Sequence, residues 1–164
     1  MEKYNLYIDF DGVILDTITP LYKEIEEKKI KKENLTKFYE KYPWDTIIKD
    51  KYIINDSIEC INKLIKTNKY DLAILTHVNS LNEAVLKIKY LRKYFKDITI
   101  IPCPKEISKT KMIHTKDAIL VDDYAGNLRE WEKEGGIPVR FNIKRNGKGF
   151  KVISKLDELI DIFD

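Results

Sequence analysis

The chain contains 164 residues, of which 43% are hydrophobic and 35% are charged, and this composition excludes fibrous and disordered classes. Thirty basic and 27 acidic residues leave a formal net charge of +3, which is too even to indicate a nucleic-acid polymer or an anionic membrane as a partner. With no apolar run of about 18 residues, no signal-peptide core and two cysteines, the sequence predicts a cytoplasmic protein of one domain, or one domain with a small insert.

Short apolar runs, each closed by a polar residue or a turn, recur along the chain. We expect buried strands at 6–8, 72–75, 98–101, 118–121 and 137–139. Runs that are apolar throughout, instead of alternating with polar residues, indicate strands buried on both faces, as in a parallel sheet.

Helical patterns lie between these runs. We expect helices that begin near residues 56, 80, 124 and 154. Asp56 and Ser80 each precede a glutamate by three residues, which is the spacing of a capping box. Strands that alternate with helices predict an α/β fold: a Rossmann-like, doubly wound parallel sheet.

The segment 16–55 interrupts the alternation, because no buried strand can be recognised in it. Thr19-Pro20 indicates a helix start instead. We therefore expect a small, mostly helical insert over 16–55, directly after the first strand, and a core built from 1–15 and 56–164. The insert is rich in aromatic residues, which would either form its own core or stack on a nucleobase: Phe38, Tyr39, Tyr42 and Trp44.

Ligands of a doubly wound sheet bind at the carboxyl ends of its strands. Polar side chains follow three of the expected strands there: Asp9 and Asp11, Thr76 and His77, and Asp122 and Asp123. Clustered carboxylates repel one another, so a cation should neutralise them, and an all-oxygen ligand set favours Mg²⁺. A carboxylate held beside a phosphate can attack phosphorus, and a second one two residues later could protonate the leaving oxygen and then activate water.

The pattern resembles, in order and spacing, the four motifs of the haloacid dehalogenase (HAD) superfamily of phosphohydrolases: Asp9-Phe10-Asp11-Gly12-Val13, Thr76, a downstream lysine, and Val121-Asp122-Asp123. The resemblance covers nearly the whole chain. It implies a Rossmann-like core, a small cap that closes over the site, and hydrolysis of a small phosphorylated substrate. Asp9 would be the nucleophile, Asp11 the general acid/base, and Thr76 a hydrogen-bond donor to the transferred phosphoryl group.

The same resemblance implies a Mg²⁺ site. The ion would be held by the Asp9 carboxylate, the Asp11 backbone carbonyl and Asp122, with Asp123 acting through water. An aspartate at the second position of the first motif favours phosphatases over the dehalogenase and phosphonatase branches.

The lysine of the third motif would pair with the nucleophile and the phosphate. Candidates are Lys105, Lys109, Lys111 and Lys116. We select Lys109, because it lies near an expected helix start and leaves room before the strand at 118–121, and keep Lys111 as the alternative. His77 could meet phosphate through its backbone N–H, and its ring either contacts the substrate or is an ordinary surface histidine.

The short insert, the first motif and the tract 122–128 followed by Trp131 look like the 5′(3′)-deoxyribonucleotidase branch of the superfamily. This resemblance implies a nucleoside or deoxyribonucleoside monophosphate as substrate. Alternatives are a HAD phosphatase of a sugar phosphate, another small phosphorylated metabolite or a phosphoprotein, and a binding protein that keeps the scaffold without turnover. Either a monomer or a homodimer is expected.

Overall fold

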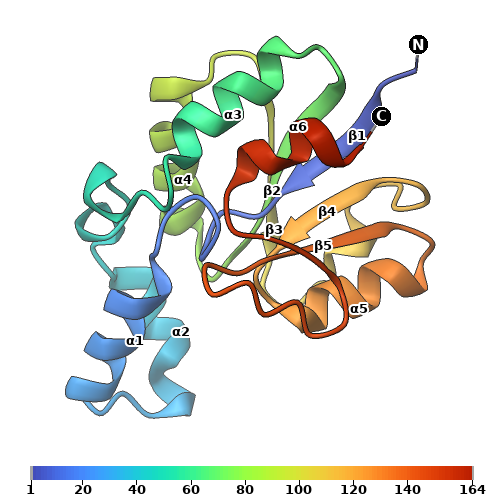
Figure 1. The fold of residues 1–164 in the computed structure, drawn as a ribbon. Helices are drawn as coiled ribbons and strands as arrows, with labels where there is room; N and C mark the ends of the chain where they lie inside the picture. Colours follow the sequence, from blue (N-terminus) through green and yellow to red (C-terminus); the bar gives the residue numbers. More distant parts are fainter. Residues whose placement is uncertain (1, 164) are drawn as a thin grey trace.

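A six-stranded parallel sheet forms the centre of the molecule in the computed structural model, which describes residues 2–163 (Figure 1). The strands are β1 (Tyr4–Ile8), β2 (Tyr70–Val78), β3 (Thr99–Pro104), β4 (Ile119–Asp122), β5 (Ile137–Phe141) and β6 (Lys151–Ile153). Their order is β3-β2-β1-β4-β5-β6, and every neighbouring pair is parallel. The prediction of a Rossmann-like α/β fold is therefore confirmed.

Helices cover both faces of this sheet. They are α3 (Ser57–Lys66), α4 (Leu81–Tyr94), α5 (Ala125–Lys133) and α6 (Leu159–Ile162). Leu6 and Ile8 of β1 belong to a large buried cluster with residues of α3, α4 and α6, whereas Tyr7 packs against a second cluster that contains Leu128 and Trp131 of α5. This alternation explains why the strands carry apolar residues at consecutive positions.

The sixth strand was not predicted. Only Ile153 is fully buried in β6, which pairs with β5 at the edge of the sheet, so it has no continuous apolar run. The structure also extends β2 to Val78, which places Thr76 and His77 within the strand and not after it. The helix expected to begin near residue 154 is instead a short 3₁₀ turn, η5 (Leu156–Glu158), followed by α6.

Only one of the two expected capping boxes has its N-cap contact. The Ser80 hydroxyl accepts a hydrogen bond from the backbone N–H of Glu83 at the start of α4. The prediction for Asp56 was wrong, because that residue has left-handed backbone angles (φ 54°, ψ 36°) in place of the extended backbone of a capping residue. The following Ser57 instead donates its hydroxyl hydrogen to the Ile14 carbonyl at 2.7 Å.

The segment after β1 folds into helices that project to one side of the sheet, at the lower left of Figure 1. They are α1 (Ile18–Glu27), α2 (Leu35–Lys41) and three 3₁₀ turns, η1 (Lys32–Asn34), η2 (Trp44–Thr46) and η3 (Asp50–Tyr52). The chain leaves and returns through a paired neck, residues 14–16 and 52–54. There Asp16 donates its N–H to Tyr52 and Ile54 donates to Ile14, at 2.8 and 3.0 Å.

The aromatic residues of this insert pack against one another. The ring centroids of Tyr42 and Trp44 are 4.9 Å apart, and those of Tyr39 and Trp44 are 5.9 Å apart. Tyr42 and Trp44 are also buried in the large cluster that continues into the sheet. The rings therefore form the insert's own core, and because this core is continuous with that of the sheet, the domain boundaries at 16 and 55 stay a prediction.

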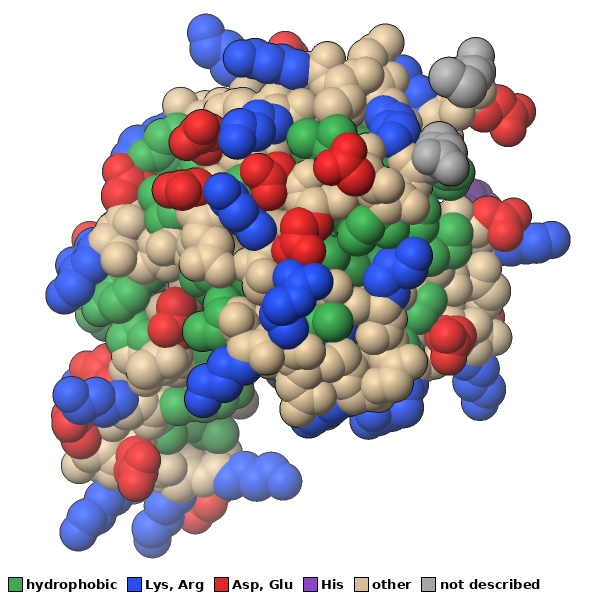
Figure 2. Space-filling model, viewed as in Figure 1, with side chains coloured by type: hydrophobic (Ala, Val, Ile, Leu, Met, Phe, Trp, Pro, Cys, Tyr) green, Lys and Arg blue, Asp and Glu red, His purple; other side chains and the backbone are tan. Residues whose placement is uncertain are grey.

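Charged side chains of both signs are interspersed over the face shown in Figure 2. This mixture agrees with the nearly balanced totals of 30 basic and 27 acidic residues. Within residues 2–163, no helix combines the length and the apolar character needed to cross a membrane.

Candidate active site

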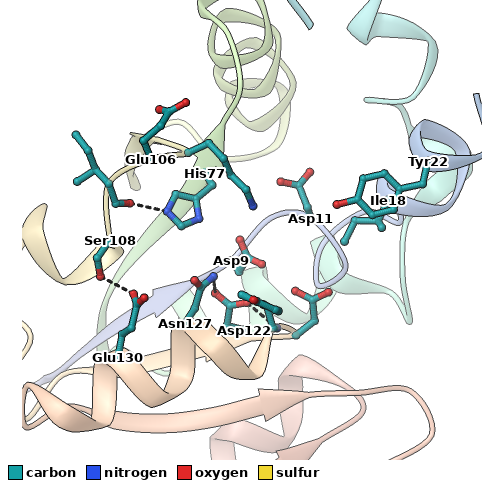
Figure 3. A pocket seen from close by; sticks show the side chains of 14 residues that line it. Asp9, Asp11, Ile18, Tyr22, His77, Glu106, Ser108, Asp122, Asn127 and Glu130 are labelled. Carbon is teal, nitrogen blue, oxygen red and sulfur yellow. Dashed lines mark hydrogen bonds between the residues drawn. The ribbon is translucent and has the colours of Figure 1, made fainter. Parts of the chain in front are cut away.

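A cavity of about 630 Å³ opens at the carboxyl edge of the sheet (Figure 3). Asp9 reaches it because its N–H continues the ladder of β1, donating to the Val121 carbonyl of β4 at 2.9 Å. Asp122 is the last residue of β4, and Asp123 follows it. The strands therefore bring residues that are more than 100 positions apart in sequence to one wall of one cavity.

Three carboxylates converge on this wall. Oxygens of Asp9, Asp122 and Asp123 all lie within 4.8 Å of one another. The ammonium of Lys109 is placed among them, 2.9 Å from Asp9 Oδ1 and 2.7 Å from Asp122 Oδ2, and is 2% exposed. Asp122 is further held by the backbone N–H of Tyr124 at 2.9 Å, and its orientation is thereby fixed.

Burial and mutual repulsion distribute the protons unevenly over the cluster. Burial, followed by the charge of Asp122, raises the pKa of Asp9 to about 7. Burial and the charge of Asp9 raise the pKa of Asp123 to about 10. Burial would also raise the pKa of Asp122, but the charge and hydrogen bond of Lys109, together with hydrogen bonds from Tyr124 and Asn127, outweigh it and lower that pKa. The same carboxylates raise the pKa of Lys109 against the effect of burial.

This donor set fits a hard divalent cation. The three carboxylates offer oxygen ligands only, and one lysine cannot balance three negative charges in a buried site. Burial, followed by repulsion between the carboxylates, raises the pKa values of Asp9 and Asp123, and a bound cation would favour their ionised forms. Mg²⁺ matches both the ligand type and the missing charge.

Asp11 points away from the carboxylate cluster. Its Oδ1 accepts a hydrogen bond from the Thr17 hydroxyl at 2.5 Å, and its Oδ2 lies 2.7 Å from the ammonium of Lys87. The side chain is 25% exposed and lines the same cavity as Asp9. The two aspartates of the first motif therefore face one cavity from different surroundings, as expected for a pair with different chemical roles.

Thr76 and His77 lie beside Asp11 but differ in access. Thr76 is 1% exposed, and its hydroxyl accepts from Lys87 at 3.0 Å behind the cavity wall. The His77 ring lines the cavity, with Nε2 2.8 Å from the Ile107 carbonyl, and burial lowers the pKa of His77. The contact with Ile107 requires a proton on Nε2. The roles of Thr76 and His77 at a phosphoryl group stay predictions.

The structure separates the candidate lysines by position. Lys109 begins the 3₁₀ turn η4 (Lys109–Lys111) and turns inward to the carboxylates, whereas Lys111 in the same turn is exposed. Lys105 and Lys116 are exposed as well. Lys109 is thus the candidate that the fold brings to Asp9, as the order of motifs suggested.

The comparisons with known proteins concern the fold that carries this site. No protein-family model and no curated protein matches the sequence. Solved structures do match: a HAD hydrolase of family IA, variant 3, from Entamoeba histolytica has a TM-score of 0.62 at 14% identity, over 94% of both chains. A HAD-superfamily hydrolase from Ehrlichia chaffeensis has a TM-score of 0.58 at 16% identity, over 97% of this chain and 96% of the other.

A third similar structure is a D,D-heptose 1,7-bisphosphate phosphatase from B. bronchiseptica in complex with magnesium and phosphate. It has a TM-score of 0.55 at 13% identity, over 94% of this chain and 95% of that chain. The fold is that of the HAD hydrolases. In this chain β1 and β4 pair side by side, and Asp9 and Asp122 stand at their carboxyl ends.

Sequence reasoning missed several cavity residues. Tyr22 of α1 and Tyr124, which precedes α5, line the cavity with rings that are 58% and 62% exposed. The buried pair Lys87 and Glu83 was missed as well. The sequence did carry a sign of this pair, because Glu83 and Lys87 lie one helical turn apart and the apolar Leu91 follows one turn later on the same face. In a lysine-rich chain, however, that single lysine did not stand out.

Gly12 keeps room for the carboxylate cluster. It has a left-handed φ of +76°, and a Cβ at this position would collide with the Asp123 carboxylate. We expect Gly12→Ala to lose about 1–2 kcal/mol of stability from the backbone alone and, in addition, to weaken Mg²⁺ binding by displacing Asp123. Titration calorimetry and thermal unfolding would measure the two effects.

Gly149 provides the matched control. It has a similar φ of +91°, and no described atom lies within 4 Å of a Cβ built there. Gly149→Ala should therefore show the backbone penalty and normal Mg²⁺ affinity. If both variants bind Mg²⁺ as the wild type does, the contact with Asp123 has no part in the metal site.

The pKa values of the cluster predict that Mg²⁺ affinity depends on pH. In the metal-free protein at neutral pH, Asp123, with a pKa of about 10, holds its proton, and Asp9, with a pKa of about 7, is partly protonated. Metal ligation needs the ionised forms, so binding releases protons and affinity should rise by about tenfold per pH unit for each proton released. Calorimetry between pH 6 and 8 in two buffers with different ionisation enthalpies would count the protons. An affinity that stays constant over this range would contradict the prediction.

The raised pKa values of Asp9 and Asp123 also make the stability of the fold depend on pH. A carboxyl group whose pKa is higher in the folded than in the unfolded state stabilises the fold at low pH and loses that contribution as pH rises through the folded value. For Asp9 this window runs from the ordinary aspartate pKa of 3.8 to the raised pKa of about 7. Mg²⁺ should therefore raise the melting temperature more at pH 8 than at pH 5.

Proposed function

We propose that this protein is a Mg²⁺-dependent phosphomonoesterase that acts through an aspartyl-phosphate on Asp9. The observation that carries the proposal is the convergence of Asp9, Asp122 and Asp123 around a buried lysine, with Asp11 facing the same cavity. The HAD fold supports it, because one similar structure is a phosphatase complexed with magnesium and phosphate.

Asp9, Asp122 and the backbone carbonyl of Asp11 would hold the ion, with Asp123 acting through water. Bound there, Mg²⁺ would neutralise charge on the carboxylates and on the substrate phosphate. Lys109, already beside Asp9 at 2.9 Å, would add a positive charge at the same place. A dianionic phosphate could then approach a carboxylate nucleophile, which would otherwise repel it.

The reaction would proceed in two steps. A carboxylate oxygen of Asp9 bonds to phosphorus, the bond from phosphorus to the ester oxygen breaks, and Asp11 gives its proton to the departing oxygen. Asp11 then takes a proton from a water molecule, whose oxygen attacks phosphorus. The bond from phosphorus to the Asp9 oxygen breaks, so that inorganic phosphate leaves and the Asp9 carboxylate is regenerated. Lys109 would stabilise the charge on the phosphoryl oxygens through both steps.

Within this class we propose a nucleoside monophosphate, such as a deoxyribonucleotide, as the substrate. A cavity of about 630 Å³ has room for more than a phosphate group. Tyr22 and Tyr124 supply exposed rings at its wall, and a base stacked on an aromatic ring gains about 1–3 kcal/mol. These two exposed rings could stack on a base, whereas the buried aromatic residues of the insert could not.

A sugar phosphate is the second candidate. The similar structure from B. bronchiseptica is a heptose bisphosphatase. The cavity also carries polar side chains that could bind sugar hydroxyls, among them Glu106, Ser108 and Glu130. The two substrate classes share the chemistry at phosphorus and differ only in what the outer cavity recognises.

Phosphate release, with and without Mg²⁺, would test both levels of the proposal. Deoxyribonucleoside and ribonucleoside monophosphates, hexose and heptose phosphates and p-nitrophenyl phosphate would be compared, with Asp9→Asn as the blank. Metal-dependent release above the blank supports the phosphatase, and the ranking of substrates decides between nucleotide and sugar. No release from any of them by protein that binds Mg²⁺ would favour a binding protein that keeps the scaffold.

Tyr22→Ala adds a sharper test of the nucleotide. Its KM for the preferred nucleotide should rise by about 5- to 150-fold, which corresponds to the loss of one stacked base. Its KM for p-nitrophenyl phosphate should change little, because that substrate reaches the phosphorus site without a base to stack. An unchanged KM for the nucleotide would remove Tyr22 from base recognition.

A further inference from the structure

Lys87 on α4 is a buried cation that the proposed chemistry does not use. Its side chain is 0% exposed, and its ammonium is surrounded by four oxygens. These are Asp11 Oδ2 at 2.7 Å, Glu83 Oε2 at 2.7 Å, Thr76 Oγ1 at 3.0 Å and the His77 carbonyl at 2.9 Å. Of these four oxygens, the Asp11 carboxylate belongs to a side chain that lines the large cavity, whereas His77, whose ring also lines it, contributes its backbone carbonyl to Lys87.

Glu83 also holds Lys87, through its carboxylate oxygen Oε2. The two residues lie one turn apart on α4, and Glu83 is 2% exposed. The other oxygen of Glu83, Oε1, accepts from the backbone N–H of Asn79 at 2.6 Å and from its side-chain amide at 3.1 Å. With both oxygens of Glu83 engaged, Lys87 is held in one position, and the Phe10 ring lies 5.2 Å from its ammonium.

The contact with Lys87 sets the direction of the Asp11 side chain. Asp11 lies two residues from Asp9, and the buried cation Lys109 is close enough to pair with Asp9. Lys87 and Thr17 take one Asp11 oxygen each and turn the carboxyl group away from that cluster. A carboxylate oxygen can accept more than one hydrogen bond, so these contacts leave room for the proton that Asp11 transfers.

We propose that Lys87 is a positioning residue, whose ammonium holds the Asp11 carboxyl group at the angle from which it protonates the leaving oxygen of the substrate. This inference rests on the proposed phosphatase function. In the step concerned, phosphorus bonds to an Asp9 oxygen, the bond from phosphorus to the ester oxygen breaks, and the proton moves from Asp11 to that oxygen. Lys87 keeps its own protons throughout.

The choice of leaving group separates this role from a merely structural one. An alkoxide is a poor leaving group and needs the proton of Asp11, whereas p-nitrophenolate departs without one. The parameter kcat/KM reports the step in which the leaving group departs. A loss of positioning therefore lowers kcat/KM for an alkyl phosphate far more than for p-nitrophenyl phosphate, and a general loss of structure lowers both alike.

The test compares 2-phenylethyl phosphate with p-nitrophenyl phosphate, two esters of similar size, in the full-length protein with Mg²⁺. Lys87→Met should lower kcat/KM for the alkyl ester by about a hundredfold and for the nitrophenyl ester by less than about threefold. Lys89→Met is the matched control, since Lys89 is exposed on the same helix, and it should change neither value.

The double variant Lys87→Met/Glu83→Gln guards against misfolding, because it removes the buried charge that Lys87→Met leaves unpaired. It should show the same selective loss. If kcat/KM falls equally for both esters in the folded variants, or does not fall, Lys87 is not a positioning residue. The proposed function fails by a different result, namely that wild type and Asp9→Asn release phosphate alike.

Discussion

Replacing Asp9 by asparagine is expected to lower phosphate release by at least about 10⁴-fold, because the variant lacks the oxygen nucleophile of the proposed reaction. The fold should remain intact. Burial and the neighbouring Asp122 raise the pKa of Asp9 to about 7, so ionised Asp9 is unfavourable in the metal-free protein. At pH 8 without metal, the amide relieves that repulsion, and we expect the variant to be at least as stable as the wild type.

Activity and thermal unfolding, measured on the same preparation, check this prediction. Asp71→Asn is a suitable control, since Asp71 is an exposed residue at the opposite end of β2, and it should leave both properties unchanged. Turnover that survives in Asp9→Asn would remove Asp9 from the nucleophile's role. A large loss of stability would instead mean that its pairing with Lys109 outweighs its repulsion by Asp122.

The second large effect is expected from Lys109→Met. This change leaves the buried carboxylates of Asp9 and Asp122 without the cation that lies 2.9 and 2.7 Å from them. Removal of one partner of a buried ion pair costs about 3–5 kcal/mol, which for a chain of this length lowers the melting temperature by about 10 °C. Mg²⁺ should restore part of the loss, since it supplies positive charge to the same carboxylates.

Melting temperatures of Lys109→Met with EDTA and with Mg²⁺ would measure how much of the lost stability Mg²⁺ restores. Lys111→Met serves as the control, because Lys111 lies in the same 3₁₀ turn and is exposed. Lys109→Met should also lose most of the proposed phosphatase activity, even where Mg²⁺ restores its stability. A Lys109→Met protein that melts in EDTA at the temperature of the wild type would show that the ion pairs in the cluster are worth little.

The fold and the carboxylate cluster could largely be predicted from the sequence because both depend on local signals. Continuous apolar runs revealed the parallel strands, and the rule that ligands bind at the carboxyl ends of such strands brought Asp9 and Asp122 together without any knowledge of the packing. The edge strand β6 could not be predicted from such signals, because it carries one fully buried residue and no apolar run.

The surroundings of Asp11 could not be predicted, because they depend on how α4 packs against the first loop. Lys87 is one of many lysines, and only the rotation of α4 turns it inward to Asp11 while Lys89 faces the solvent. The cavity aromatics are a similar case. Tyr22 and Trp44 both belong to the insert, and helix packing decides that Trp44 is buried and Tyr22 lines the cavity.

The attachment of the insert limits how it can move. Besides the paired neck, Asp50 on the returning side accepts hydrogen bonds from the hydroxyls of Tyr90 and Tyr94 on α4, at 2.8 and 2.5 Å. The hydroxyl of Ser80 also donates to the Tyr39 carbonyl at 3.1 Å. A hinge motion of the whole insert would have to break these bonds together, so substrate would enter through an opening that already exists. Binding would then be a one-step encounter, and the turnover rate would follow the chemistry or phosphate release and not the swing of a lid.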